Sequence, residues 1–289
     1  MTRALDALLG ILDLEELEVN LFRGRSPQEG SQRVFGGQVL GQALIAAGRT
    51  VERDAAHSFH AYFLRPGDPK TPILYQVDRT RDGKSFTTRR IIAIQHGRAI
   101  FHLEASFQRH EPGPEHQDAM PEAPDPESLP DFRERMEPLA RKNSAEVKRW
   151  LESDRPIDLR YVTDFDPIEP EKLPPRQLVW VRADGTLPDS RLLHQCVVAY
   201  ASDLTLLDTA ALPHGISWIG RGWQIASLDH AMWFHRDFRA DEWLLYEQQS
   251  PVAAGARGFT TGRLFARDGS LVVSVVQEGL FRRLEGSSP

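Results

Sequence analysis

The sequence contains only one cysteine, Cys196, among 289 residues. An internal disulfide is therefore excluded, as is typical of a protein of the reducing cytoplasm. The chain also lacks an apolar run of about 18 residues, the length that a membrane-spanning helix needs. Its leucine-rich residues 1–17 carry acids such as Asp6 and Asp13, which predicts an amphipathic helix rather than a signal peptide. We therefore expect a cytoplasmic protein that does not insert into a membrane.

An excess of positive charge is also missing. The 35 Lys and Arg residues are outnumbered by 41 Asp and Glu residues, which gives a formal net charge of −6. This composition provides no electrostatic footprint for nucleic acid. An anionic ligand would need local cations, and several lie close together in sequence: Arg65, Arg79, Arg81, Lys84, Arg89 and Arg90. Each of these alone is more typical of a solvated strand edge or loop.

The common catalytic motifs are absent too. No G-x-S-x-G segment occurs, which disfavours an α/β-hydrolase. No His-Glu-x-x-His segment or cysteine cluster offers a metal site. The glycines Gly36, Gly37 and Gly41 lack the spacing of a dinucleotide-binding turn. We expect neither a metal nor a cofactor.

The most informative feature that is present is an internal repeat. Five short segments of the first half recur in the second half in the same order and at nearly constant offsets. The pairs are 58–62 with 229–233, 63–66 with 234–237, 73–75 with 244–246, 85–89 with 258–263, and 96–100 with 268–272. Such self-similarity predicts two copies of one structural unit.

Both halves share one layout: an extended segment, one helix, then four strands. The helices are expected at residues 37–49 and 190–207. The first is apolar almost all round, which is typical of a buried helix. Hairpin turns are expected at 82–83, 96–97 and 268–269, where glycine tolerates positive φ. Strands in direct succession pair antiparallel, so we predict an α+β double hotdog: two tandem units, each an antiparallel sheet wrapped around a central helix.

A segment rich in proline and acids interrupts the repeat. It opens at residues 111–116 and contains four further prolines before residue 131, a composition typical of a linker. Residues 131–151 then predict an amphipathic helix on the surface. We therefore divide the chain into an N-terminal unit (1–110), a linker with a surface helix (111–156) and a C-terminal unit (157–289).

Two polar residues stand on faces that should be apolar. Asp203 continues the buried stripe of the second helix, and Gln277 lies on the apolar face of the last strand, where side chains alternate. A buried carboxylate needs hydrogen-bond donors, and the Gln277 amide or the Ser227 hydroxyl could supply them. Ordinary structural roles, such as a surface Asp or a Gln at a strand end, account for each residue singly. His57, His60, His194, His230 and His235 are likewise more typical of structural positions.

Around these residues the sequence closely resembles the acyl-CoA thioesterase II family. The similar strings in the second half are 193–196, 199–203, 228–236 and 276–279; those in the first half are 34–38, 57–60, 62–68, 81–83 and 85–86. The resemblance covers nearly the whole chain. It implies a double hotdog with one active site, in the second half, formed by Asp203, Ser227 and Gln277. The family more commonly has Thr where this chain has Ser227.

The resemblance further implies hydrolysis of fatty acyl-CoA to free fatty acid and coenzyme A. Asp203 would take a proton from a water that Ser227 and Gln277 help to hold, and that water would attack the thioester carbonyl. A backbone N–H near the start of a central helix could stabilise the oxyanion. No covalent intermediate is required, and a nucleophilic Ser227 is less attractive because no histidine base is evidently placed for it.

Two alternatives stay open from the sequence. A hydratase or dehydratase of the same fold would use an Asp–His pair, so a histidine in hydrogen-bond reach of Asp203 would favour it. A non-catalytic module that binds acyl-CoA would lack a polar cluster that holds water. The two units can pair within one chain, and the family suggests a homo-oligomer, a dimer or a tetramer.

Overall fold

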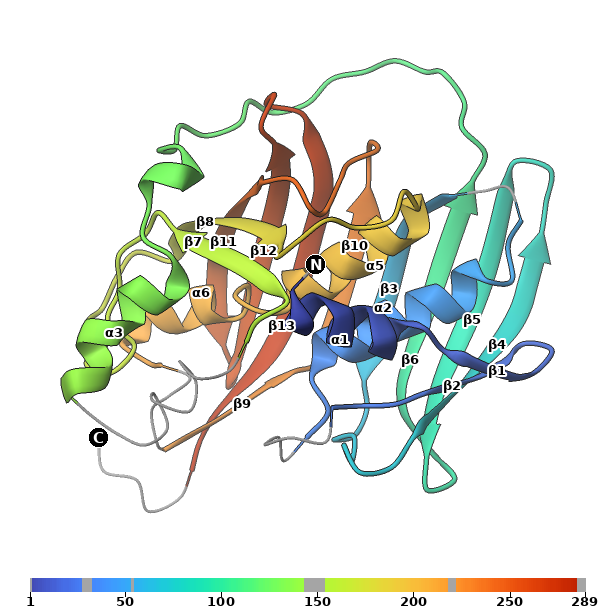
Figure 1. Ribbon diagram of the computed structural model, residues 1–289. Helices are drawn as coiled ribbons and strands as arrows, with labels where there is room; N and C mark the ends of the chain where they lie inside the picture. Colours follow the sequence, from blue (N-terminus) through green and yellow to red (C-terminus); the bar gives the residue numbers. More distant parts are fainter. Residues whose placement is uncertain (1, 28–32, 53–54, 143–153, 218–221, 285–289) are drawn as a thin grey trace.

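The computed structural model describes residues 2–27, 33–52, 55–142, 154–217 and 222–284 (Figure 1). The first half contains α1 (Arg3–Leu12), β1 (Glu15–Glu18), β2 (Leu21–Gly24), α2 (Gly36–Gly48), β3 (Ala55–Phe63), β4 (Ile73–Asp82), β5 (Phe86–Gln95) and β6 (Arg98–Gln108). The connecting segment contains the 3₁₀ turn η1 (Pro126–Ser128) and α3 (Phe132–Lys142). The second half contains β7 (Ile157–Tyr161), β8 (Arg176–Ala183), α5 (Arg191–Ser202), α6 (Asp208–Ala211), η2 (Leu212–His214), β9 (Trp223–Ser227), β10 (Asp229–Phe234), β11 (Leu244–Ala254), β12 (Arg257–Ala266) and β13 (Leu271–Arg283).

The described strands form a single antiparallel sheet to which both halves contribute. Its order is β1-β2-β4-β5-β6-β3-β10-β13-β12-β11-β8-β7, with β9 paired to β13. The halves join where β3 pairs with β10, with Phe59 opposite Met232 and Ala61 opposite His230. The central helices α2 and α5 lie together against one face of this sheet (Figure 1). This is the predicted double hotdog, and no described helix is long and apolar enough to cross a membrane.

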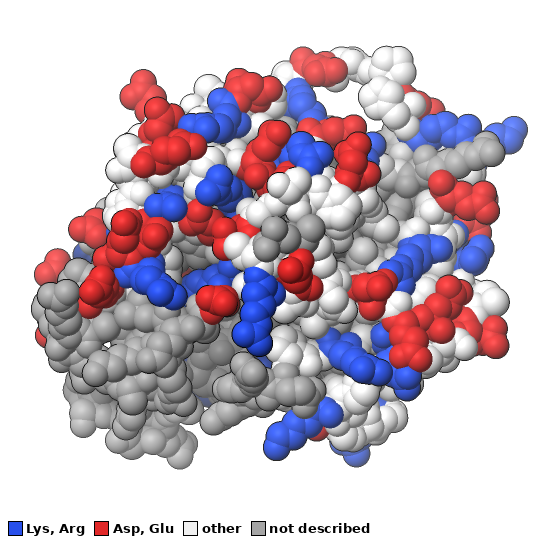
Figure 2. Space-filling model, in the orientation of Figure 1, with Lys and Arg blue, Asp and Glu red and all other residues white. Residues whose placement is uncertain are grey.

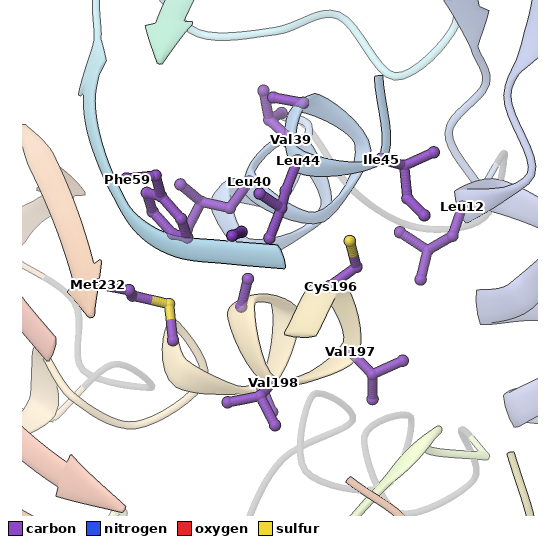
Figure 3. Close-up of a cluster of buried hydrophobic side chains, with 14 of the residues drawn as sticks. Leu12, Val39, Leu40, Leu44, Ile45, Phe59, Cys196, Val197, Val198 and Met232 are labelled. Atoms are coloured by element: carbon purple, nitrogen blue, oxygen red, sulfur yellow. The ribbon is translucent and has the colours of Figure 1, made fainter. Parts of the chain in front are cut away.

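The helix α2 is buried along nearly its whole length, as its all-round apolarity predicts. Every residue from Gly37 to Ala47 is buried, and Leu40 and Leu44 face the Cys196 side of α5 (Figure 3). Glycines permit the close approach of the two helices. A Cβ on Gly41 would lie 3.2 Å from the Cys196 carbonyl oxygen, and one on Gly37 would lie only 2.4 Å from that of Tyr200. The N-terminus of α2 is thereby held against the C-terminus of α5.

The predicted second helix is too long at its C-terminus. The helix α5 ends at Ser202, and Asp203 is its C-cap residue. The backbone tightens here, because the Leu204 N–H donates to the carbonyl of Ala201, three residues back, and this ends the α-helical ladder. A turn follows before the short helix α6.

Two details of the predicted strands also differ from the structure. The strand expected from Ala226 onward is broken at Leu228 into β9 and β10, so the second central helix is followed by five strands, not four. Leu271 does not share the inner face of β13, because a register shift between β12 and β13 turns it toward a cluster on the other face, with Trp180 and Trp243. From Val273 to Phe281 the expected alternation of buried and partly exposed residues holds.

The hairpin predictions are confirmed at His96–Gly97, where both residues have positive φ, and at Gly269. At Gly83 the physical reason is wrong, since its φ is not positive. Glycine is needed there because a Cβ would lie 2.6 Å from the carbonyl oxygen of Phe86.

The connecting segment covers part of the outer sheet face of the second half. Met120, Ala123 and Leu129 pack on the outer cluster around Trp180, whose indole N–H donates to the Pro124 carbonyl at 2.9 Å. The predicted surface helix is present as α3 up to residue 142, and its expected continuation over 143–151 lies outside the described residues. The division of the chain at residues 111 and 156 stays a prediction.

Charged side chains of both signs mix over the face that Figure 2 shows. Many of them are paired, for example Arg23 with Glu15 and Arg267 with Glu127. The negative net charge is therefore spread over this face rather than gathered in one patch.

Candidate active site

The structure brings Asp203, Ser227 and Gln277 into direct contact. The Gln277 Nε2 donates to Asp203 Oδ1 at 2.7 Å and lies 2.9 Å from the Ser227 hydroxyl oxygen. The Ser227 hydroxyl in turn lies 3.3 Å from Asp203 Oδ1. Three residues spread over 75 positions of sequence thus form one connected polar cluster, which we call the Asp–Ser–Gln cluster.

The sheet explains why two of these side chains point inward. Gln277 is fully buried because it occupies an inward position of β13. Ser227 lies opposite Gly279 of the same strand, and directly opposed residues in an antiparallel pair share a face. The break at Leu228 decouples Ser227 from Asp229, which accepts a hydrogen bond from the Glu278 N–H instead. The alternation of side chains along the sequence does not by itself decide which face of the sheet Ser227 points to, because Asp229 would point to the same face in an unbroken strand.

The first half also contributes to the cluster. The backbone N–H of Gly37, in the first turn of α2, donates to the Asp203 carboxyl. A Cβ on Gly36 would lie 2.6 Å from Asp203 Oδ2, so only glycine lets the carboxylate approach this closely. The contact of the α2 N-terminus with Asp203 is not predicted from the sequence. The Gly36–Gly37 pair at the start of the expected helix is the feature that could indicate such a close approach.

Burial controls the ionisation of Asp203. It raises the pKa of the carboxyl to about 6, against the opposing effect of hydrogen bonds from Gln277, Gly37 and Ser227. Such a group is mostly ionised at pH 7 and still close enough to neutrality to exchange a proton, as a general base requires. The Gln277 Oε1 atom is buried and has no donor among the described residues. Both side chains thus carry hydrogen-bond acceptors, the Asp203 carboxylate and the Gln277 amide oxygen.

The cluster opens on a cavity of about 550 Å³ that both halves line. The first half supplies Phe35, Phe63, Arg33 and Arg65, and the second half supplies Leu207, Ile225 and the cluster residues Asp203 and Ser227. A largely apolar cavity with a few convergent polar groups is the usual form of a small-molecule site. Of the six basic residues singled out in the sequence, Arg65 lines this cavity. Arg89 is instead buried and bonded to Thr50.

No histidine within the described ranges hydrogen-bonds to Asp203. The imidazole of His230 bonds to the Ser202 hydroxyl at 3.0 Å, and burial lowers its pKa to about 3. Of the other candidates, His57 bonds to Ser106, His235 to Ser274 and His194 to the Ala240 N–H, and the ring of His60 lies edge-on to Trp233. The Asp–His pair that a hydratase would need is therefore not formed at Asp203.

Two fused hotdog units with a polar cluster at their junction, opening on an apolar cavity, define a double hotdog enzyme. The sequence comparisons show which one: the chain belongs to the acyl-CoA thioesterase II family. Residues 153–280 match the family described as acyl-CoA thioesterase, and residues 24–108 match the acyl-CoA thioesterase N-terminal domain.

Individual relatives agree along the full chain. It is 44% identical to acyl-coenzyme A thioesterase 8 of Homo sapiens over 94% of this chain and 88% of the relative. It is 38% identical to acyl-CoA thioesterase 2 of Haemophilus influenzae over 98% and 99%. The crystal structure of the acyl-CoA thioesterase II TesB2 from Mycobacterium marinum is similar at 48% identity, with a TM-score of 0.80, over 97% of this chain and all of that chain. The family and fold that the sequence predicted are thereby confirmed.

Proposed function

We propose that this protein hydrolyses fatty acyl-CoA to free fatty acid and coenzyme A by direct attack of water. The observation that carries the proposal is the Asp203 carboxylate, which is partly buried at the junction of the two units and bonded by Gln277 and Gly37. It faces a cavity long enough to be lined from both halves. Family membership supports the reaction, and the cluster supports the choice of residues.

In the proposed mechanism, the attacking water donates one hydrogen bond to Asp203 and another to Gln277 Oε1. Its oxygen bonds to the thioester carbonyl carbon while one of its protons passes to Asp203. The first-turn N–H groups of α2 have no intrahelical partners. The Gly37 N–H bonds Asp203, so a neighbouring N–H of this turn is the donor proposed to stabilise the oxyanion. The C–S bond then breaks, and the proton held by Asp203 passes to the leaving sulfur.

The cluster argues against the alternatives. In the part of the chain that the structure describes, the Ser227 hydroxyl contacts Asp203 and Gln277 and no imidazole, so the usual histidine base of a serine nucleophile is not formed there. A hydratase of the type considered above would need an imidazole at Asp203. A module that only binds its ligand has no use for a buried carboxylate, whose burial costs stability.

The test is release of thiol from acyl-CoA substrates of increasing chain length. We expect Asp203→Asn to lower kcat/KM by about 100- to 10,000-fold, the usual contribution of a general base. Asp229→Asn is the matched control, because Asp229 lies on the adjacent strand and bonds the backbone of Glu278 outside the cluster. Undiminished hydrolysis by Asp203→Asn would remove this residue from the mechanism. Absence of thiol release at every chain length would refute the activity itself.

Ser227→Ala separates the two possible routes. Direct water attack predicts a partial loss, since Asp203 and Gln277 still hold the water. A serine nucleophile predicts a loss as complete as that of Asp203→Asn, together with an acyl-enzyme that hydroxylamine can trap.

We further propose that the protein acts in the cytoplasm as a homo-oligomer, a dimer or a tetramer. The site itself does not require a second copy, because the β3–β10 junction brings both units together within one chain. Analytical ultracentrifugation of the active protein decides the oligomeric state.

A further inference from the structure

The cavity beside the Asp–Ser–Gln cluster is lined by both halves of the chain. The first half supplies Arg33 and Arg65 together with apolar side chains such as Phe35 and Phe63. The second half supplies Leu207 and Ile225, which belong to an apolar cluster with Phe281. Basic side chains suit the phosphates of coenzyme A, and apolar side chains suit an acyl chain.

One carboxylate lies next to Leu207 in the chain and lines the same cavity. Asp208, the first residue of α6, lines the catalytic cavity together with Leu207. It also lines a second cavity of about 20 Å³ enclosed by Phe165, Leu173, Leu212 and other residues. Asp208 is therefore the residue shared by the two cavities and stands between them.

Asp208 is also unusual among the partly buried acids that the structure describes. Within the described residues no side-chain or backbone donor hydrogen-bonds to its carboxyl. Burial and the neighbouring Asp203 raise its pKa to about 7. A carboxyl that is partly neutral and bonded to no donor contributes little to holding the fold, so its side chain acts here chiefly through the space that it occupies.

We propose that Asp208 closes the acyl end of the catalytic cavity and thereby limits the length of acyl chain that the enzyme accepts. This rests on the function proposed above, and it names which end of the cavity takes the acyl chain. Removing the side chain beyond Cβ would connect the two cavities and lengthen the acyl end.

The experiment measures kcat/KM over a series of saturated acyl-CoAs for the wild type and for Asp208→Ala, Asp208→Asn and Asp208→Leu. We expect Asp208→Ala to move the optimum to longer chains by about two carbon atoms, with a gain of about fourfold for each newly buried methylene. Asp208→Leu fills the space and moves the optimum to shorter chains. Asp208→Asn keeps the size of the side chain and therefore the order of preference.

Glu171→Ala is the matched control, because Glu171 lines only the second cavity. It removes an acid without opening the boundary, so the optimum stays in place. An unchanged optimum in Asp208→Ala would overturn the proposal, as would an equal shift in Asp208→Asn or in Glu171→Ala. Binding of non-hydrolysable acyl-CoA thioethers to the same variants measures the length limit without chemistry. Failure of the proposed reaction is thus distinguished from failure of the length limit.

Discussion

The hydrogen bond from Gln277 to Asp203 makes a quantitative prediction about the dependence of catalysis on pH. This bond is 2.7 Å long, its donor is fully buried, and it stabilises the ionised carboxylate. A hydrogen bond to a charged group contributes about 1.5 to 3 kcal/mol, and about 1.4 kcal/mol corresponds to one pKa unit. Gln277→Met removes the amide with little change in volume. The pKa of Asp203, about 6 in the native protein, should then rise to about 7 to 8.

The expected result is a shift in the pH profile of kcat/KM. A general base works only when ionised, so the native activity should be lost as the pH falls through about 6. In Gln277→Met this acidic limb should lie near pH 7 to 8, which at pH 7 lowers the ionised fraction from about nine-tenths to between about a half and a tenth. The ratio of native to variant kcat/KM should therefore narrow as the pH rises from 7 to 9. Any decrease in kcat/KM of Gln277→Met that remains at pH 9 measures the loss of the proposed hydrogen bond between the attacking water and Gln277 Oε1.

The matched control is Gln248→Met. Gln248 is also fully buried, but its amide bonds to Gln177 and Thr205 rather than to the Asp–Ser–Gln cluster. This variant should lose stability and keep the native acidic limb. An acidic limb that stays at its native pH in Gln277→Met, or one that moves equally in Gln248→Met, would refute the assignment of Asp203 as the titrating base.

Two further predictions concern stability. The pKa of Asp203 is raised from 3.8 to about 6, so the native state holds this proton more tightly than the unfolded chain does and stability is lost as the pH rises from about 4 to 6. Asp203→Asn should therefore be more stable than the native protein at pH 7.5, by up to about 3 kcal/mol. Urea unfolding should show no such gain at pH 3.5. Gly37→Ala would place a Cβ 2.4 Å from the carbonyl oxygen of Tyr200 and should lower the free energy of unfolding by about 1 to 3 kcal/mol. Gly10→Ala, with nothing within 4 Å of its Cβ, should be neutral or stabilising by up to about 1 kcal/mol. Equal unfolding midpoints of the two variants would contradict the packing argument.

The sequence predicts those parts of the site that depend on local periodicity. Gln277 is found because alternation along β13 marks it as the polar exception on a buried face. Asp203 is found because it continues the spacing of the α5 stripe, even though the helix itself ends one residue earlier. In both cases the side chain follows from its neighbours in sequence, so no knowledge of the tertiary structure is needed.

The parts that depend on pairing between distant elements could not be predicted. The orientation of Ser227 follows from the break at Leu228, which arises because β9 pairs with one end of β13 while β10 pairs with both β13 and β3. The contribution of Gly37 follows from the packing of α2 against α5. Neither arrangement leaves a period in the sequence, although the Gly36–Gly37 pair marks a place where a backbone approaches something closely.

The repeat raises the question of why, within the described residues, the Asp–Ser–Gln cluster is formed in one of two similar units and not in the other. The aligned segments place Thr87 of β5 at the position of Thr260 in β12. Thr260 pairs with Gln277, and Thr87 pairs with Phe107. The position equivalent to Gln277 is therefore apolar: it is Phe107 by this pairing and Ala105 by the match of 96–100 with 268–272, and each has 1% of its surface exposed. It can neither donate to a carboxylate nor hold a water.

The position equivalent to Asp203 has changed as well. Asp203 is the C-cap residue of α5, and the C-cap residue of α2 is Arg49. Arg49 turns outward and pairs with the exposed carboxylate of Asp13. A carboxylate beside Phe107 would be buried without a donor, at a cost of several kcal/mol. The apolar Phe107 on β6 therefore agrees with the presence of Arg49, rather than an acid, at the end of α2. The N-terminus of α2, in the first unit, contacts the cluster in the second unit. In the first unit itself, the position equivalent to Gln277 is occupied by an apolar side chain that packs in the core. We infer from this that each chain carries one catalytic site.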